Sequence, residues 1–389
     1  LINNMNFSGG RRMFLEYARW LMESGRHNIR VLTLKKKGDL KDYVDSIEVP
    51  AFNKKSIGTV DIIVATTVPD VKQGFDADIA PVIHFCQGFE IDDLIQRVNG
   101  QVSPERYKGN TLLGKLRWER KKIEWKVLIK KIDSVYRLDT FLATISPHLV
   151  TRLEERYGRS VSLVKYGVHK EIFYPDKSFR APREFSFTRP CRIISIAPRS
   201  VTFKGIPTTI EAIRIAKSKG LPIHFTRVTP DKSELNNYEK DVIDEIFAGL
   251  KPNELAEIAR RADIYVSNST EGEGFGLPAM EALSCGTLCI LSSISSYKSF
   301  SDRNDYCLFV PEMDSNATVN AIRTYIEMPL DKRLEYRKNA IDASANHTFD
   351  KSCESFEKML TEVFENKKQK KKSTKSLRKT HKRLIENKI

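Results

Sequence analysis

The sequence of 389 residues contains no run of about 18 apolar residues, the length that a helix needs to cross a bilayer. It also lacks, near its start, the charged and then apolar pattern of a secretion signal. Both absences argue against a membrane-spanning or secreted chain, and they predict a cytoplasmic protein. The chain opens with Leu1 and Ile2 inside what reads as the end of a strand, so we expect this strand to begin upstream.

Cysteine is sparse and lacks the spacing of a redox or metal site. Six cysteines are spread along the chain, with no C-x-x-C pair and no histidine cluster beside them, which fits a reduced compartment. Cys285 and Cys289 flank Gly286 in an apolar stretch, so we expect buried structural thiols there. We assign no acidic motif to a metal ion, and we expect no metal site and no resident cofactor.

The composition predicts a folded protein of two domains. Apolar residues make up 40% of the chain and aromatic residues 9%, which excludes a wholly disordered chain. A length of 389 residues exceeds what one hydrophobic core usually supports. There is no short-period repeat, so a repeat protein is not expected either.

Positive charge is concentrated at one end of the chain. The formal net charge is +15, and residues 367–389 hold nine lysines and two arginines against Glu386, a net charge of +10 that leaves +5 for the rest. Because the body is only mildly basic, nucleic acid is not expected as a partner. For the tail, two readings stay open: a disordered, solvated segment, or transient adhesion to anionic lipid.

Strands and helices alternate along both halves of the chain. The Gly9-Gly10 turn precedes apolar residues at helical spacing and a β-branched run, which predicts a βαβ unit. The stretch 174–190 is polar and contains prolines, and a second alternating series follows it. We therefore predict an α/β fold with two Rossmann-like, doubly wound domains facing a cleft. The expected parts are an N-terminal domain (1–175), a C-terminal domain (176–348), a helix (349–366) and a basic, disordered tail (367–389).

The densest chemical signal is the segment 267–286, a glycine loop between a predicted strand and a helix. Gly274 and Gly276 let a ligand approach the backbone closely. Pro278, near the first helical turn, leaves free amides and the positive end of the helix dipole for an anion. Such a site suits a diphosphate.

Two acids flank this loop, and they allow two readings. Glu273 and Glu281 would accept hydrogen bonds from the hydroxyl groups of a sugar and a ribose. In the structural alternative the loop is a turn whose acids cap the helix, since Glu281 would fall in the first turn.

The whole string resembles the E-x7-E signature of the retaining glycosyltransferases of family four, also described as glycosyl transferases group one, which have the GT-B fold. Here Glu273 and Glu281 enclose seven residues. The resemblance implies that Glu273 contacts the donor sugar as a catalytic residue and that Glu281 holds the ribose. It also implies that the diphosphate meets the intervening backbone, at Gly274, Phe275, Gly276 and Leu277.

A second match lies in residues 197–206, after the first strand of the second domain. Taken alone, Arg199 and Lys204 would read as solvated cations. The loop is similar to the family's Gly-Arg-x4-Lys-Gly motif, although Pro198 stands where glycine is common. The resemblance implies that both cations are catalytic and neutralise the departing nucleotide diphosphate.

The first domain resembles the family's acceptor side. Gly9 and Gly10 match its glycine-rich turn, which implies that they bind substrate. Many relatives carry a histidine near the reacting sugar after the central strand, and that position here holds Gln87. We therefore expect Gln87 to contact sugar and His84 to be a packed strand residue.

The stretch 115–131 is rich in lysine and arginine and has two apolar stripes. A face with Trp118 and Trp125 would rest on an anionic membrane, which would place the protein peripherally at the inner face. A second stripe on the opposite side, Leu116 and Ile123 with Val127, is typical of a helix half buried in a domain.

These features predict a hexosyltransferase-type, retaining glycosyltransferase of glycan biosynthesis. It would move a sugar from a nucleotide diphospho-sugar, its co-substrate, to a cell-surface glycan, a lipid-linked acceptor or a protein, without a metal ion. Two alternatives stay open. One is a GT-B epimerase of nucleotide sugars or a phosphorylase; the other is a non-catalytic binding protein that uses the basic tail and the tryptophan-bearing stretch.

Overall fold

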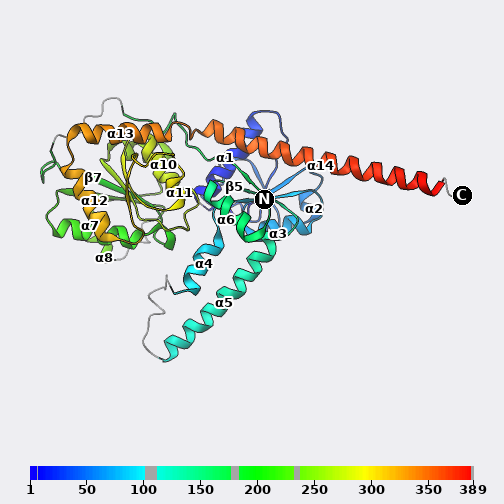
Figure 1. The fold of residues 1–389 in the computed structure, drawn as a ribbon, viewed down its shortest axis with the longest axis horizontal. Helices are drawn as coiled ribbons and strands as arrows, with labels where there is room; N and C mark the ends of the chain where they lie inside the picture. Colours follow the sequence, from blue (N-terminus) through cyan, green and yellow to red (C-terminus); the bar gives the residue numbers. More distant parts are fainter. Residues whose placement is uncertain (7, 101–111, 177–183, 232–236, 387–389) are drawn as a thin grey trace.

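The computed structural model describes residues 1–6, 8–100, 112–176, 184–231 and 237–386 of the chain. These residues form two α/β domains that lie side by side, and a long last helix runs from one domain across the other (Figure 1). The sheets of both domains are parallel. The α/β fold with two parallel-sheet domains that the sequence predicts is therefore confirmed.

The N-terminal domain contains a four-stranded sheet in the order β3-β4-β5-β6 and a separate pair, β1 and β2. The predicted opening strand amounts to one bridge between Ile2 and Thr33, so the first regular element is a helix. The strands are β1 (Val31–Thr33), β2 (Ser46–Glu48), β3 (Ile63–Ala65), β4 (Val82–Cys86), β5 (Phe141–Thr144) and β6 (Val161–Leu163). The helices are α1 (Gly9–Glu23), α2 (Lys54–Ile57), α3 (Val68–Asp76), α4 (Glu90–Val98), α5 (Leu112–Tyr136) and α6 (Pro147–Tyr157).

The C-terminal domain contains a six-stranded sheet in the order β12-β11-β10-β7-β8-β9. Its strands are β7 (Cys191–Ile196), β8 (Ile223–Thr229), β9 (Glu245–Ala248), β10 (Ile264–Ser267), β11 (Leu288–Ser292) and β12 (Leu308–Val310). Its helices are the 3-10 turn η2 (Thr202–Lys204), α7 (Ile206–Ser218), α8 (Asn237–Lys240), α9 (Pro252–Arg261), α10 (Leu277–Ser284), α11 (Ser295–Lys298), α12 (Ser315–Glu327) and α13 (Leu330–Ser344).

The winding of this second sheet reverses between β7 and β10. The first strand along the chain, β7, lies in the middle, with β8 and β9 on one side and the three later strands on the other. Doubly wound sheets bind ligands at the carboxyl ends of the strands beside such a reversal. The loop after β7 carries Arg199 and Lys204, and the loop after β10 carries Glu273. The topology thus brings both predicted donor loops to one edge of the sheet.

The chain passes between the domains twice, and the two passages are bonded to each other. Val168 pairs with Thr348 in a parallel bridge flanked by main-chain hydrogen bonds. A Cβ atom on Gly167 would overlap the carbonyl oxygen of Thr348, so the position requires glycine. Residues 177–183, part of the predicted interdomain stretch 174–190, lie outside the described residues, and the predicted domain boundary stays a prediction.

The last helix, α14 (Phe349–Glu386), returns to the N-terminal domain. Phe356 stacks on Tyr17 of α1 with ring centroids 4.6 Å apart, and it meets Phe85 of β4 edge-on at 5.3 Å. The helix predicted over 349–366 therefore completes the core of the N-terminal domain.

The helix α14 continues beyond residue 366, where the sequence predicts a disordered tail. Its backbone stays helical to Glu386, while residues 387–389 lie outside the described residues. Lysine, arginine, glutamine and glutamate favour helices, which accounts for the continuation. Lys367 still touches the N-terminal domain through its Nζ, which donates to the carbonyl oxygen of Asp61 at 2.9 Å.

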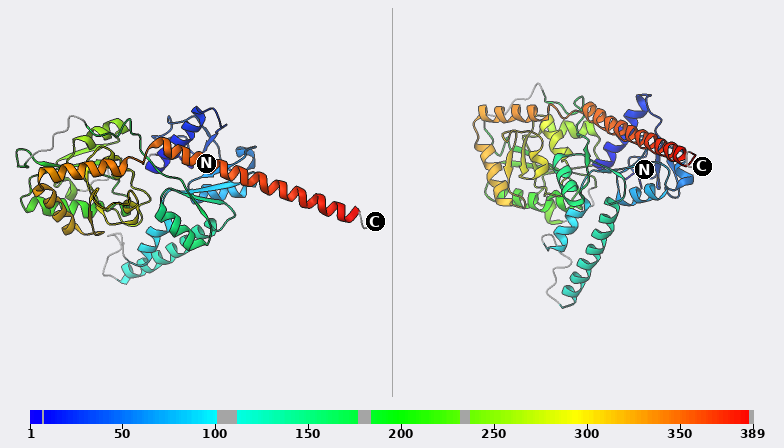
Figure 2. Two further views of the ribbon diagram at one scale, coloured as in Figure 1. Left: turned by 45° about the horizontal axis from the view of Figure 1, so that its top comes forward. Right: turned by 45° about the vertical axis from the view of Figure 1, so that its right-hand side comes forward.

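The helices α4 and α5 extend together away from both domains (Figures 1 and 2). The two faces of α5 (Leu112–Tyr136) are exposed in the opposite sense to the expected one. Ile132, which lies seven residues after Trp125 and so on the same face, is only 7% exposed, whereas Leu116 and Ile123 are 60% and 63% exposed. The stripe expected to be buried therefore faces solvent. Within the described residues, no helix has both the length and the apolar character needed to cross a membrane.

All six cysteines are buried and free of disulfide bonds. Burial raises the pKa of Cys285 to about 12, so its thiol stays protonated at neutral pH and is a poor nucleophile. The interpretation of Cys285 and Cys289 as buried thiols is confirmed.

Candidate functional site

The glycine loop joins β10 to α10 at the carboxyl edge of the C-terminal sheet. Gly276 precedes the helix with a φ of 89°, a conformation that glycine adopts without strain. Pro278 lies in the first turn, where its missing N–H is not needed. The start of α10 presents the positive end of its dipole to the loop, while the amides of Ala279 and Met280 donate to the carbonyl oxygen of Gly276. The anion site stays a prediction.

Glu281 lies deeper in α10 than the sequence analysis expects. It is the fifth residue of the helix, and α10 has no acid in its first turn. The capping alternative is therefore wrong in its geometry.

The carboxylate of Glu281 instead pairs with a cation from the N-terminal domain. The distance from Glu281 Oε1 to Arg12 Nη2 is 3.0 Å, and the two side chains are 4% and 9% exposed. Burial raises the pKa of Glu281, and Arg12 offsets this only in part. Arg12 was not predicted, although two arginines in a row after the Gly9-Gly10 turn are a signal for an anion partner.

Glu273 and Lys204 meet at the edge where the two loops converge. The Nζ of Lys204 lies 2.6 Å from Oε2 of Glu273, and the hydroxyl of Ser269 donates to the same oxygen at 3.2 Å. The side chain of Glu273 is 7% exposed and that of Lys204 is 18% exposed. Two predicted site residues from separate motifs therefore form one largely buried ion pair.

The second cation of the loop after β7 has a different partner. Nε of Arg199 pairs with the carboxylate of Glu239 in α8, whose side chain is buried. Glu239 lies in no recognisable motif, so no local signal distinguishes it from other acids on the chain. This pair holds Arg199 beside the Lys204 loop without engaging Glu273.

Gln87 holds the glycine turn of the N-terminal domain in place. Its Nε2 donates to the carbonyl oxygen of Gly10 at 2.8 Å and to the hydroxyl of Tyr166 at 2.6 Å. A Cβ atom on Gly10 would press against the Gln87 side chain. In the structure, Gln87 therefore fixes the turn, and its contact with sugar stays a prediction.

The glycine loop and the N-terminal domain touch directly. A Cβ atom on Gly274 would overlap the carbonyl oxygen of Gln87, and one on Gly9 would lie 3.8 Å from Leu277. Phe275 turns its ring into an aromatic cluster, with centroids 5.5 Å from Tyr166. The predicted binding residues of the two domains therefore lie at one interface, where the Phe275 ring is taken up by packing.

His84 lies away from this interface, inside β4. It is fully buried and packs against Tyr136 with tilted rings whose centroids lie 4.2 Å apart. Burial lowers its pKa to about 3, so the imidazole is neutral at neutral pH. The structure thus places His84 as a packed strand residue.

Acids and cations lie next to one another throughout the site. Within the described part of the chain, no three His, Cys, Asp or Glu side chains are grouped closely enough to hold a metal ion. Lys204 and Arg199 pair with the carboxylates of Glu273 and Glu239, and Arg12 pairs with those of Glu281 and Glu16. Such an arrangement can take up an anionic ligand, because the anion can replace a carboxylate as the partner of a cation.

The sequence of the C-terminal domain matches a known family. Residues 192–343 match the model described as "Glycosyl transferases group 1". No curated protein sequence is similar enough to the chain to count as a match.

Solved structures share the fold of the whole chain at low sequence identity. Sucrose-phosphate synthase from Thermosynechococcus elongatus has a TM-score of 0.70 and 17% identity, over 94% of this chain and 96% of that one. A glycosyltransferase from Rickettsia africae ESF-5 has a TM-score of 0.64 and 16% identity, over 94% and 98%. Anabaena Alr3699/HepE in complex with UDP and glucose has a TM-score of 0.64 and 14% identity, over 92% and 98%.

Proposed function

We propose that this chain, a group 1 glycosyl transferase with the GT-B fold, transfers a sugar to an acceptor hydroxyl. The sugar would come from a nucleotide diphospho-sugar, and its configuration would be retained. The observation that carries the proposal is the ion pair of Glu273 and Lys204 at the reversal point of the C-terminal sheet. The glycine turn and Gln87 of the other domain lie across from it.

The donor would rearrange the partners of these charged groups. Its diphosphate would bind Lys204 and the amides at the start of α10, which frees Glu273 to accept hydrogen bonds from the hydroxyl groups of the donor sugar. Glu281, held by Arg12, would accept from the ribose. Negative charge grows on the diphosphate as it leaves, and Lys204 and Arg199 would stabilise it electrostatically.

The transfer itself needs no covalent intermediate with the protein. The bond from the sugar carbon to the phosphate oxygen breaks, and the acceptor oxygen forms the new bond on the same face of the sugar. The acceptor proton passes to the departing phosphate. Because cations of the protein neutralise the leaving group, we propose a metal-independent reaction of hexosyltransferase type.

A nucleotide diphospho-sugar as donor also agrees with one structure of similar fold, in which Anabaena Alr3699/HepE holds UDP and glucose. The acceptor would be a glycan, a lipid-linked molecule or a protein, entering from the side of Gln87. An enzyme of this kind would work in glycan biosynthesis in the cytoplasm.

A nucleotide-sugar panel tests this function. The full chain is mixed with UDP, GDP and ADP sugars, and its melting temperature and product formation are measured with candidate acceptors. A donor at one hundred times its Kd should stabilise the fold by about 2.7 kcal/mol. Epimer formed from donor alone would favour an epimerase, and sugar phosphate released from a glycan by inorganic phosphate would favour a phosphorylase. Binding without turnover across the panel would favour a binding protein.

We further propose that α5 rests on an anionic membrane surface. Its exposed apolar residues are Leu113, Leu116, Ile123, Val127 and Leu128. Residues 112–136 carry eight lysines and arginines against three acids, a net charge of +5. An exposed apolar stripe with flanking cations binds the headgroup region of anionic lipid through both burial and charge.

Vesicle sedimentation checks this contact. The double variant Leu116→Asn, Ile123→Asn is expected to bind vesicles containing phosphatidylglycerol several-fold more weakly than the unmodified chain, because it loses buried apolar area. Leu334→Asn is the matched control, since Leu334 is also exposed but lies on α13 of the other domain. If the double variant sediments like the unmodified chain, α5 makes no such contact and the basic tail accounts for any binding.

A further inference from the structure

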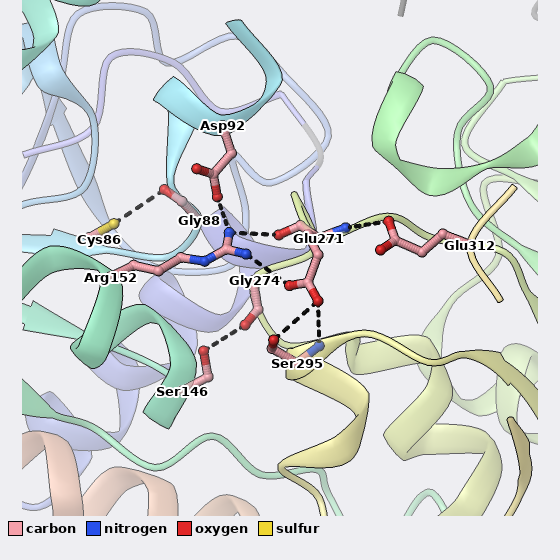
Figure 3. Close-up of polar contacts among 9 residues, drawn as sticks. All are labelled: Cys86, Gly88, Asp92, Ser146, Arg152, Glu271, Gly274, Ser295 and Glu312. Atoms are coloured by element: carbon pink, nitrogen blue, oxygen red, sulfur yellow. Dashed lines mark hydrogen bonds and ion pairs between the residues drawn. The ribbon is translucent and has the colours of Figure 1, made fainter. Parts of the chain in front are cut away.

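Arg152 of α6 connects the two domains beside the glycine loop (Figure 3). Its guanidinium pairs with the carboxylate of Asp92 in α4. The same group donates to Glu271 twice, from Nη1 to the carbonyl oxygen at 3.1 Å and from Nη2 to Oε2 at 2.9 Å. Arg152, a side chain of the N-terminal domain, thus holds both the main chain and the carboxylate of Glu271. Glu271 lies in the glycine loop between β10 and α10, which is called the donor loop below.

Glu271 is fixed within its own domain as well. Its Oε1 accepts from the amide of Ser295 at 2.9 Å and from the hydroxyl of Ser295 at 3.1 Å. Its own amide donates to Glu312 at 3.1 Å. Figure 3 shows these contacts converging on Glu271 from both domains. Glu271 therefore has all of its main-chain and side-chain polar groups engaged.

The helix α6 holds the donor loop at a second point. Ser146, which precedes α6, donates from its hydroxyl to the carbonyl oxygen of Gly274 at 2.7 Å. The two anchors, at Glu271 and Gly274, lie on either side of Glu273. The position of the Glu273 backbone is therefore set from the N-terminal domain.

Such anchoring matters because the loop is intrinsically soft. Glycines at 272, 274 and 276 give it more backbone freedom than any other residue type would. A displacement of about 1 Å at a reacting group can cost about 10²-fold in rate. A planar guanidinium with two parallel donors restricts position and orientation together, which a single lysine ammonium does not.

We propose that Arg152 is a positioning residue for Glu273. Arg152 ties Glu271 to α4 and α6 of the N-terminal domain. The donor loop therefore holds Glu273 in the position needed for the reaction only when the two domains are in contact. The inference rests on the proposed function for the role of Glu273, whereas the effect of Arg152 on the order of the loop can be measured without any substrate.

The test compares full-length Arg152→Gln with Arg156→Gln. Arg156 lies one turn further along α6 but pairs with Asp133 inside the N-terminal domain, at 2.9 Å. Arg152→Gln should speed amide hydrogen exchange in peptides covering residues 269–277 and lower kcat by about 10–100-fold. The Kd for the free nucleotide diphosphate should change less than about two-fold, since Arg152 contacts none of the residues assigned to it. Arg156→Gln should leave loop exchange and kcat unchanged.

A double-mutant cycle with Glu271→Gln shows whether the two residues act together. If Arg152 works through Glu271, the double variant should be no slower than the worse single variant. Arg152→Lys should recover only part of kcat.

Unchanged loop exchange in Arg152→Gln, or fully additive losses in the cycle, would overturn the proposal. A parallel loss of nucleotide affinity and kcat would also overturn it, because it would indicate general damage to the fold. If the unmodified chain turned over no donor at all, the proposed function would fail, and loop exchange would still decide the role of Arg152.

Discussion

Glu273→Gln is expected to lower kcat/KM by about 10²–10³-fold, the loss that follows removal of one preorganised polar contact to a reacting group. The substitution keeps the shape of the side chain but removes the negative charge that pairs with Lys204 at 2.6 Å. An amide also offers one acceptor oxygen in place of two, so it holds the sugar hydroxyls less well. Initial rates with the donor found in the nucleotide-sugar panel measure the effect.

The matched control for this substitution is Glu257→Gln. Glu257 lies on α9 of the same domain, is 60% exposed and makes only a 3.9 Å contact with Arg261. Both variants should keep the circular dichroism spectrum of the unmodified chain. Wild-type turnover in Glu273→Gln would remove Glu273 from the catalytic site.

Lys204→Ala is expected to lower kcat by a similar factor of about 10²–10³, because it removes a cation from the developing charge on the diphosphate. It should also destabilise the free protein, because the sheltered carboxylate of Glu273 then lacks its ion-pair partner. Thermal unfolding and single-turnover rates are measured in parallel. Lys204→Arg, which keeps the charge, should retain more activity than Lys204→Ala.

The double variant Lys204→Ala, Glu273→Gln separates stability from chemistry. It should recover much of the thermal stability lost in Lys204→Ala, since no unpaired carboxylate remains buried. Its turnover should stay as low as that of the single variants. Recovery of turnover together with stability would mean that the pair is structural and that the diphosphate binds elsewhere.

Much of the fold follows from local pattern. The strand β4 is buried at every position, so apart from His84 it appears in the sequence as an apolar run. The strand β9 was not predicted because it has only four residues and none of them is fully buried, so its short apolar run does not indicate a strand. The wrong stripe of α5 was expected to be buried. The helical period of the sequence reveals two apolar stripes, but it does not show which of them packs against α4 and the sheet.

The residues of the site also fall into those that local sequence predicts and those that it does not. Glu273, Glu281 and Lys204 were found because each lies in a contiguous motif whose chemistry is readable. Arg152 and Glu239 lie in ordinary helices, and their contacts form only when distant segments fold together. Nothing local distinguishes Arg152 from Arg156, which has the same charge and the same helix but a different partner.

The path of α14 has a consequence for the order in which the protein is made. The C-terminal domain is continuous between the two bonded passages at Val168 and Thr348, so it can close its core while α14 is still being synthesised. Tyr17 and Phe85, by contrast, must wait for Phe356 to leave the ribosome before they are covered. The domain that begins first along the chain is therefore completed last, and its uncovered aromatic face is the surface that a chaperone would meet on the nascent chain.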